Sequence, residues 1–165
     1  MAFQTLIDHK KQCGFGLIEI MVTLVVLAVG LLGIATLQMR GYQTSQISLN
    51  RTVAVLKAND MADRIRANSA GAVAGAYNSI SGYPLSYTDC TQTTCTAEQL
   101  AEFDRYEWNY NLSLVLPSGQ GTVVANGNMF TVTVMWDEFN SGATGTGCDY
   151  ENEDDMRCVI LEIRI

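Results

Sequence analysis

The stretch Cys13-Gly14-Phe15-Gly16-Leu17-Ile18-Glu19-Ile20 opens the segment that decides the fold, because a long apolar run continues from it. Between Phe15 and Leu37 the only charged residue is Glu19. A helix over this range would be about 35 Å long, at roughly 1.5 Å per residue, which is enough to cross a bilayer. An ordinary secretory signal has a shorter apolar core followed by a site of small residues, so the sequence predicts a retained membrane helix.

Glu19 is the anomaly within this apolar run. A carboxylate in a membrane segment is costly and usually has a partner or a function. Lys10 and Lys11 precede the run. By the positive-inside rule they keep the N terminus cytoplasmic and send the rest of the chain across the membrane.

Residues 13–20 resemble the cleavage motif of type IV prepilins. In that family a dedicated prepilin peptidase cuts after a glycine that ends a basic leader, and methylates the new N terminus. The resemblance implies that residues 1–14 are a cleaved leader, that the cut lies between Gly14 and Phe15, and that Phe15 becomes N-methylated. Glu19 then occupies the position of the family's glutamate, and we expect it to pair during assembly with the new amine, its own or a neighbour's.

The same resemblance implies a location and a set of partners. We expect a single-pass protein of the bacterial inner membrane, with a periplasmic C-terminal domain, that later enters a cell-surface pilus. The implied partners are the prepilin peptidase, other minor pilins and the major pilin, contacted through the N-terminal helix, and a tip adhesin. No cofactor is expected.

The helical pattern continues beyond the apolar run. No proline occurs from Gln38 to Asn68, and apolar side chains recur at helical spacing at Ile47, Ala54, Ala58, Met61 and Ile65. We therefore expect a membrane or filament-core half of the helix at residues 15–37 and an amphipathic half at residues 38–69. The apolar stripe would pack against a globular domain of residues 70–165.

The globular domain combines a short helix with strands. Thr96 to Tyr106 reads as a helix with Thr96 as its cap and Gln99 completing a capping box. Alternating apolar residues predict three antiparallel strands, at Trp108–Leu116, Phe130–Trp136 and Val159–Ile165. The expected fold class is α+β, the type IV pilin fold, with a long N-terminal helix packed on a small antiparallel sheet.

Cysteine usage agrees with an exported domain. Besides Cys13 in the leader, the chain has Cys90, Cys95, Cys148 and Cys158. An even set after an export-type N terminus indicates disulfides in an oxidising compartment. Of the possible pairings we favour Cys90–Cys95 and Cys148–Cys158, because each closes a short loop. The alternatives are free buried thiols or a zinc site with four thiolate ligands, although short CxxC knuckles are absent.

Composition argues against several classes of function. The only histidine is His9, in the leader, so the mature chain has no Ser-His or Cys-His pair and no histidine ligand for a metal. We predict no catalytic residues and no enzyme activity. The net charge of −7 provides no electrostatic footprint for nucleic acid. Asp149, Glu151 and Glu153 form a weak calcium candidate, but the EF-hand pattern is missing and a solvated acidic loop is favoured.

Further segments resemble PilV-type minor pilins in particular. They are Asp60–Asn68, Cys95–Trp108, Leu116-Pro117-Ser118-Gly119 and the strand that ends in Trp136. This resemblance implies a low-abundance subunit of the fimbrium that primes pilus assembly in a tip complex, with cell adhesion and twitching motility as the associated processes. The alternatives are a pseudopilin of type II secretion, which would share the cut site and the helix, and an adhesive or DNA-uptake pilin.

Overall fold

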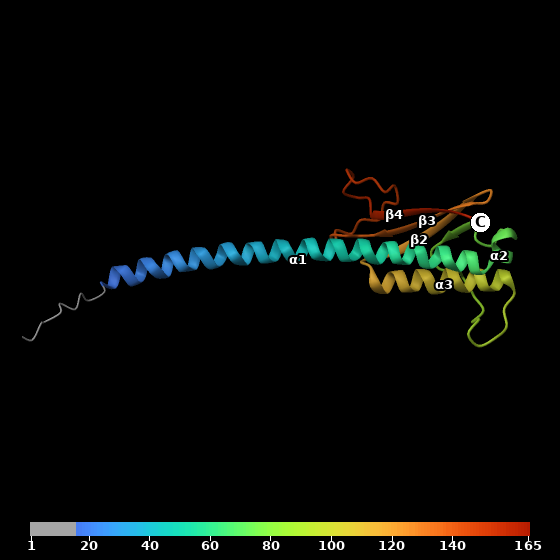
Figure 1. The fold of residues 1–165 in the computed structure, drawn as a ribbon, viewed down its shortest axis with the longest axis horizontal. Helices are drawn as coiled ribbons and strands as arrows, with labels where there is room; N and C mark the ends of the chain where they lie inside the picture. Colours follow the sequence, from blue (N-terminus) through green and yellow to red (C-terminus); the bar gives the residue numbers. More distant parts are fainter. Residues whose placement is uncertain (1–15) are drawn as a thin grey trace, which may run out of the picture. The chain divides into compact units, whose positions relative to one another are not determined.

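A computed structural model describes residues 16–165 of the chain. It forms two compact units, one ending at Thr44 and one covering Ser45–Ile165, which we call the head. The elements, shown in Figure 1, are α1 (Leu17–Ala67), α2 (Ser69–Val73), β1 (Ser79–Ser81), α3 (Ala97–Val115), β2 (Gln120–Asn126), β3 (Met129–Trp136) and β4 (Arg157–Arg164). A long N-terminal helix followed by a small antiparallel sheet is the α+β architecture that the sequence predicts.

Helix α1 passes through both units without interruption. The chain has no proline before Pro84, so no residue in this range lacks a backbone donor. The helix ends at Ala67. Its last turn contains the basic residues Arg64 and Arg66, whose positive charges interact favourably with the negative end of the helix dipole. Asn68 then leaves the helical conformation, and its side chain accepts a hydrogen bond from the Gly71 N–H to cap α2.

The head has one main core, which α1, α3 and one face of the sheet share. Helix α1 contributes the fully buried residues Ala54, Ala58, Met61, Ala62 and Ile65. Three of these five are alanines, so the helix backbone can approach its neighbours closely. Ile47, which the predicted stripe includes, is 36% exposed and does not belong to this core.

Helix α3 begins as predicted but extends much further. Thr96 is its N-cap, and Thr96 and Gln99 exchange both hydrogen bonds of the capping box. The helix does not end at Tyr106 but continues to Val115. The predicted strand Trp108–Leu116 is therefore wrong.

The burial pattern of α3 explains this error. The helix buries Ala101, Asp104, Trp108 and Leu112, which are three or four residues apart. Tyr110 and Leu114, which strand alternation would place beside Trp108, are 46% and 64% exposed. The apolar residues of this segment match both periods, and packing against α1 and the sheet selects the helical one.

The sheet is antiparallel, with strand order β1-β2-β3-β4. Strands β3 and β4 lie where the alternation predicts them, whereas β1 and β2 were not predicted. Strand β1 is only three residues long, and glycine at Gly121 weakens the apolar alternation of β2. Both are strands because the ladder next to them supplies backbone hydrogen bonds, not because of a strong pattern of their own.

Trp108 lies where α1, α3 and β2 meet. Its ring is completely buried, and its indole Nε1–H donates to the main-chain oxygen of Lys57 in α1 at 2.8 Å. On the sheet side, a Cβ at Gly121 would overlap the Trp108 ring. Glycine at this position therefore allows α3 to pack directly on the β2 backbone.

We predict that Gly121→Ala lowers the free energy of unfolding by about 1–3 kcal/mol, because the new methyl group must displace the indole ring. Val124→Ala, on the opposite face of β2, is the control and is expected to change it by no more than about 0.5 kcal/mol. Chemical denaturation of the full chain in detergent, followed by tryptophan fluorescence, measures both. Equal stability of the two variants would contradict this packing.

Candidate functional site

The first part of α1 presents an apolar surface on every side. Its large apolar side chains from Leu17 to Leu37 are each more than half exposed within the described chain. The helix is long and apolar enough to cross a membrane. The hydroxyls of Thr23 and Thr36 donate to main-chain oxygens of Ile20 and Leu32, at 2.8 and 3.0 Å. The segment can therefore enter an apolar phase without unpaired hydroxyl donors.

Gly30 and Gly33 face open space within residues 16–165. A Cβ placed on either residue would meet no described atom within 4 Å. Small residues on an apolar helix let another helix approach closely. These two positions therefore mark a surface suited to helix packing.

Glu19 lies in the first turn of α1. Its N–H donates to the Gly16 oxygen at 2.9 Å, and its side chain is exposed. No described residue from 16 to 165 forms an ion pair with its carboxylate. A carboxylate at the N-terminal end of a helix is favoured by the helix dipole. Gly14 and Phe15, the residues of the predicted cut, lie outside the described range.

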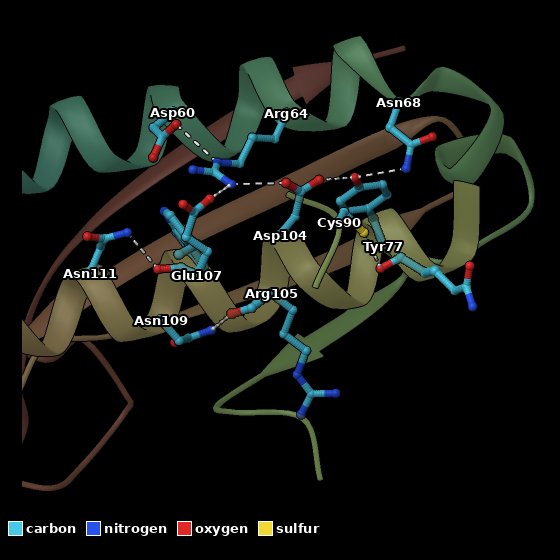
Figure 2. Close-up of polar contacts among 12 residues, drawn as sticks. Asp60, Arg64, Asn68, Tyr77, Cys90, Asp104, Arg105, Glu107, Asn109 and Asn111 are labelled. Atoms are coloured by element: carbon cyan, nitrogen blue, oxygen red, sulfur yellow. Dashed lines mark hydrogen bonds and ion pairs between the residues drawn. The ribbon is translucent and has the colours of Figure 1, made fainter. Parts of the chain in front are cut away.

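A second polar site joins α1 to α3 and is centred on Arg64 (Figure 2). The Arg64 Nη1 donates to Asp104 Oδ1 at 3.0 Å and to Glu107 Oε2 at 2.6 Å, and its Nε donates to Asp60 at 3.1 Å. The Arg64 side chain is 22% exposed and that of Asp104 only 8%. We call Arg64 and its three carboxylates, together with Tyr77 and Asn68, the Arg64 junction.

Tyr77 and Asn68 satisfy the remaining groups of the junction. The completely buried Tyr77 hydroxyl donates to the second Asp104 oxygen. The Asn68 amide nitrogen donates to the Tyr77 hydroxyl at 3.1 Å and to the Ala97 oxygen at 2.7 Å. The junction thus connects the end of α1, the segment after α2 and the first half of α3 through hydrogen-bonded charges.

The environment of the junction shifts two pKa values. Burial lowers the pKa of Arg64, but its bonds to Glu107, Asp60 and Asp104 outweigh this effect and raise the pKa above its ordinary value. Burial, and then the hydrogen bond to Asp104, raise the pKa of Tyr77. Arg64 therefore stays a cation and Tyr77 a neutral donor across the physiological range.

Two family models match this chain. A model of the prokaryotic N-terminal methylation motif matches residues 9–35, and a model described as type IV pilin Tt1218 matches residues 36–106. This chain is a type IV pilin-like prepilin. No curated protein and no solved structure matches it significantly. The second match includes every residue of the Arg64 junction except Glu107.

For this pilin-like chain, the methylation motif implies processing by a prepilin peptidase and assembly with other pilins. The motif and the apolar helix together fit a subunit that is first anchored in a membrane and then enters a pilus. Type IV pilins are structural proteins rather than enzymes.

The pilin-like head contains two disulfides. Cys90 is bonded to Cys95 and Cys148 to Cys158, with Cα–Cα distances of 5.6 and 5.7 Å. The first closes the loop directly before the Thr96 cap of α3. The second ties the loop after β3 to the start of β4.

The acidic loop of the head does not assemble a metal site. No group of three or more His, Cys, Asp or Glu side chains within residues 16–165 is placed to hold a metal ion. Asp149 accepts a hydrogen bond from the Glu151 N–H at 2.9 Å, and Asp155 accepts one from the Asp149 N–H at 3.0 Å. Glu151 and Glu153 are exposed. These carboxylates shape the loop or face solvent, so the structure does not bring the weak calcium candidates together.

The sequence interpretation missed the Arg64 junction. Asp60 and Arg64 are four residues apart, which is the spacing of an ion pair within a helix, so the sequence alone could have predicted this one contact. The partners Asp104 and Glu107, however, follow Arg64 by 40 and 43 residues, and only the packing of α3 on α1 brings them close.

We predict that Arg64→Ala lowers the free energy of unfolding of the head by about 3–5 kcal/mol, because it leaves the buried Asp104 without its cation. Arg64→Lys retains the charge but not the forked geometry, and is expected to have a smaller effect. Denaturant unfolding of the full chain in detergent measures both.

Arg66→Ala is the matched control for this prediction. Arg66 is 51% exposed and pairs at the surface with Asp63, itself 74% exposed. Its loss is expected to change stability by no more than about 1 kcal/mol. An Arg64→Ala variant as stable as Arg66→Ala would show that the junction does not hold α3 in place.

Proposed function

We propose that this chain is a minor pilin that is cut between Gly14 and Phe15, primes type IV pilus assembly and sits in a complex at the pilus tip. The observation that carries the proposal is the first part of α1, whose apolar side chains are all exposed and whose first turn presents Glu19. Such a surface is compatible with a membrane or with the apolar helices of other subunits, and not with water. The match to the methylation motif supports the same use.

The proposed assembly step is a transfer of α1 from lipid to a bundle of neighbouring α1 helices. Residues 15–37 form the half that is exchanged, while residues 38–69 and the domain of residues 70–165 stay outside the membrane. In lipid the segment contacts acyl chains, and in the bundle it contacts other helices. Backbone hydrogen bonds lie within the helix in both states, so only side-chain packing changes.

In this proposal Glu19 determines the axial position that each subunit takes in the bundle. Cleavage produces a charged amine on Phe15, and neither the amine nor the carboxylate is stable alone in an apolar bundle. Pairing Glu19 with the amine of its own chain or of a neighbour offsets the desolvation cost of both charges. The pairing distance then sets the axial position of one subunit against the next.

The resemblance to PilV-type chains supports a priming role rather than the role of the main fibre protein. The segment Asp60–Asn68, one of the four that carry that resemblance, contributes Asp60, Arg64 and Asn68 to the Arg64 junction. A pseudopilin of type II secretion would use the same helix and the same processing. The two roles differ in the phenotype of a deletion, because only a priming minor pilin changes the number of surface pili.

Mass spectrometry of the protein from its native membrane tests the processing step. We expect a mature N terminus at methylated Phe15, and a start at Met1 or another cut would overturn the proposed leader. Deleting the gene is expected to lower the number of surface pili, counted by electron microscopy. A normal pilus count with lost protein secretion would favour the pseudopilin role.

We predict that Glu19→Gln is processed normally but enters pili about tenfold less than the wild type, the ratio expected for a loss of about 1.4 kcal/mol. The amide has nearly the same size but cannot neutralise an amine. Glu102→Gln, an exposed glutamate of α3, is the matched control and is expected to assemble normally. Immunoblots of sheared pili against membranes give the ratio, and equal incorporation of the two variants would refute the ion pair.

A further inference from the structure

The tip of the β2–β3 hairpin contains an asparagine followed directly by a glycine. Asn126 ends β2, and Gly127 begins the two-residue turn that leads into β3. Of the ten asparagines in the chain, Asn126 is the only one that glycine follows. The amide carbon of an asparagine can react with the next main-chain nitrogen to close a five-membered ring. Any side chain on the next residue hinders this closure, so this dipeptide hinders it least.

The fold requires glycine at the first position of this turn. Gly127 has a φ of +63°, whereas Asn128, the second turn residue, has no positive φ. This is the pattern of a type II′ hairpin, which places glycine first. A Cβ on Gly127 would meet no atom within 4 Å, so backbone conformation rather than packing selects the glycine.

The fold makes no comparable demand on the Asn126 side chain. It is exposed and forms no hydrogen bond within residues 16–165. Five other asparagines each donate a side-chain hydrogen bond to a main-chain oxygen, namely Asn59, Asn68, Asn109, Asn111 and Asn128. The Asn126 amide is therefore accessible to water and is not held away from the Gly127 nitrogen.

The attacking nitrogen is also unbonded. The Ala125 N–H donates to the Asn78 oxygen at 3.1 Å, so the next residue, Asn126, directs its backbone groups towards Met129. Gly127 lies beyond this last pair of the ladder, and within residues 16–165 its N–H has no hydrogen-bond acceptor. Ring closure turns the Asn126 carbonyl away from Met129. It therefore requires opening only at the end of the hairpin, where local opening costs least.

We propose that Asn126 is a self-modification site, at which the folded head converts a side-chain amide into a carboxylate. The Gly127 nitrogen attacks Asn126 Cγ and gives up its proton, the Cγ–Nδ2 bond breaks, and ammonia leaves a succinimide ring. Water, the only co-reactant, then adds to one of the two ring carbonyls. Opening on one side gives aspartate, and opening on the other gives isoaspartate, whose main chain runs through the side-chain carbons.

Both products change the tip of the hairpin. Each adds a negative charge to a chain whose formal net charge is already −7. Isoaspartate also lengthens the main chain before the turn, so the Asn126–Met129 pair loses its register. Because Gly127 and Asn128 line a small cavity together with Phe130, the new carboxylate forms next to that cavity. The reaction needs no other protein, so this inference goes beyond the proposed function and does not depend on it.

Peptide mass spectrometry of the full chain, kept folded in detergent and neutral buffer, tests the proposal. We expect residue 126 to lose its amide at least about tenfold faster than residue 128. Asn128 must also release its hydrogen bond to the Ile165 oxygen, and its ring would close on Met129, whose side chain hinders attack. We expect isoaspartate among the products, because direct hydrolysis of the amide gives aspartate alone.

Three results would overturn the self-modification site. They are equal rates at residues 126 and 128, reaction at residue 126 only after unfolding in denaturant, and aspartate without isoaspartate. This comparison uses the wild-type chain and does not depend on the folding of any variant.

Asn126→Gln is the matched variant. Its longer side chain would have to close a six-membered ring, so we expect loss of the amide at residue 126 to be at least about tenfold slower. The denaturation midpoint should stay unchanged, because the replaced side chain is exposed and unbonded. Hydroxylamine, which opens the succinimide and cuts the chain, is expected to cleave the wild type after residue 126 and to spare the variant. Equal cleavage of the two chains would contradict the ring intermediate.

Discussion

One uninterrupted helix must satisfy two different environments, and the rest of the structure follows from this constraint. From Leu17 to Leu37 the side chains of α1 are apolar on every side and exposed within the described chain. From Ala54 onward one alanine-rich stripe is buried in the head. Because the backbone hydrogen bonds of a helix lie within it, the chain can change environment along its length without changing conformation.

In the head, α1 has only one apolar stripe, and the surrounding elements must hold the helix in a fixed orientation. The small side chains of α1 let other elements approach closely, but they do not fix the position of α3. Trp108 and the Arg64 junction fix that position. Trp108 donates to the α1 backbone at Lys57, while Arg64 bonds to two carboxylates of α3. Loss of Arg64 would leave the buried Asp104 carboxylate without a cation. The arrangement of α3 on α1 that keeps this ion pair is therefore favoured.

The two edges of the sheet show how the head limits contact with other chains. At β1 the strand has three residues, and Arg105 donates hydrogen bonds to the main-chain oxygens of Ser81 at its end and of Gly82 and Tyr83 beyond it. At β4 the Cys158 oxygen accepts a hydrogen bond from the Tyr150 hydroxyl, and no residue from 16 to 165 bonds to the outer backbone groups of Ile160, Glu162 or Arg164. Glu162 and Arg164 project from the exposed face there, and charges on an edge strand discourage pairing with unrelated chains.

The sequence by itself determined the features whose physical basis is local. A sustained apolar run without proline makes a membrane-length helix, Thr96 and Gln99 start α3, and alternation marks β3 and β4. Tertiary structure decided the rest. Residues Trp108–Leu116 match helical and strand periods equally, and burial of Trp108 against Lys57 and Gly121 selects the helix. Arg64 reads as a surface charge until α3 brings Asp104 to it across 40 residues of sequence. Which atoms of β4 face outward depends on its register with β3, and that register is a property of the folded sheet rather than of any segment.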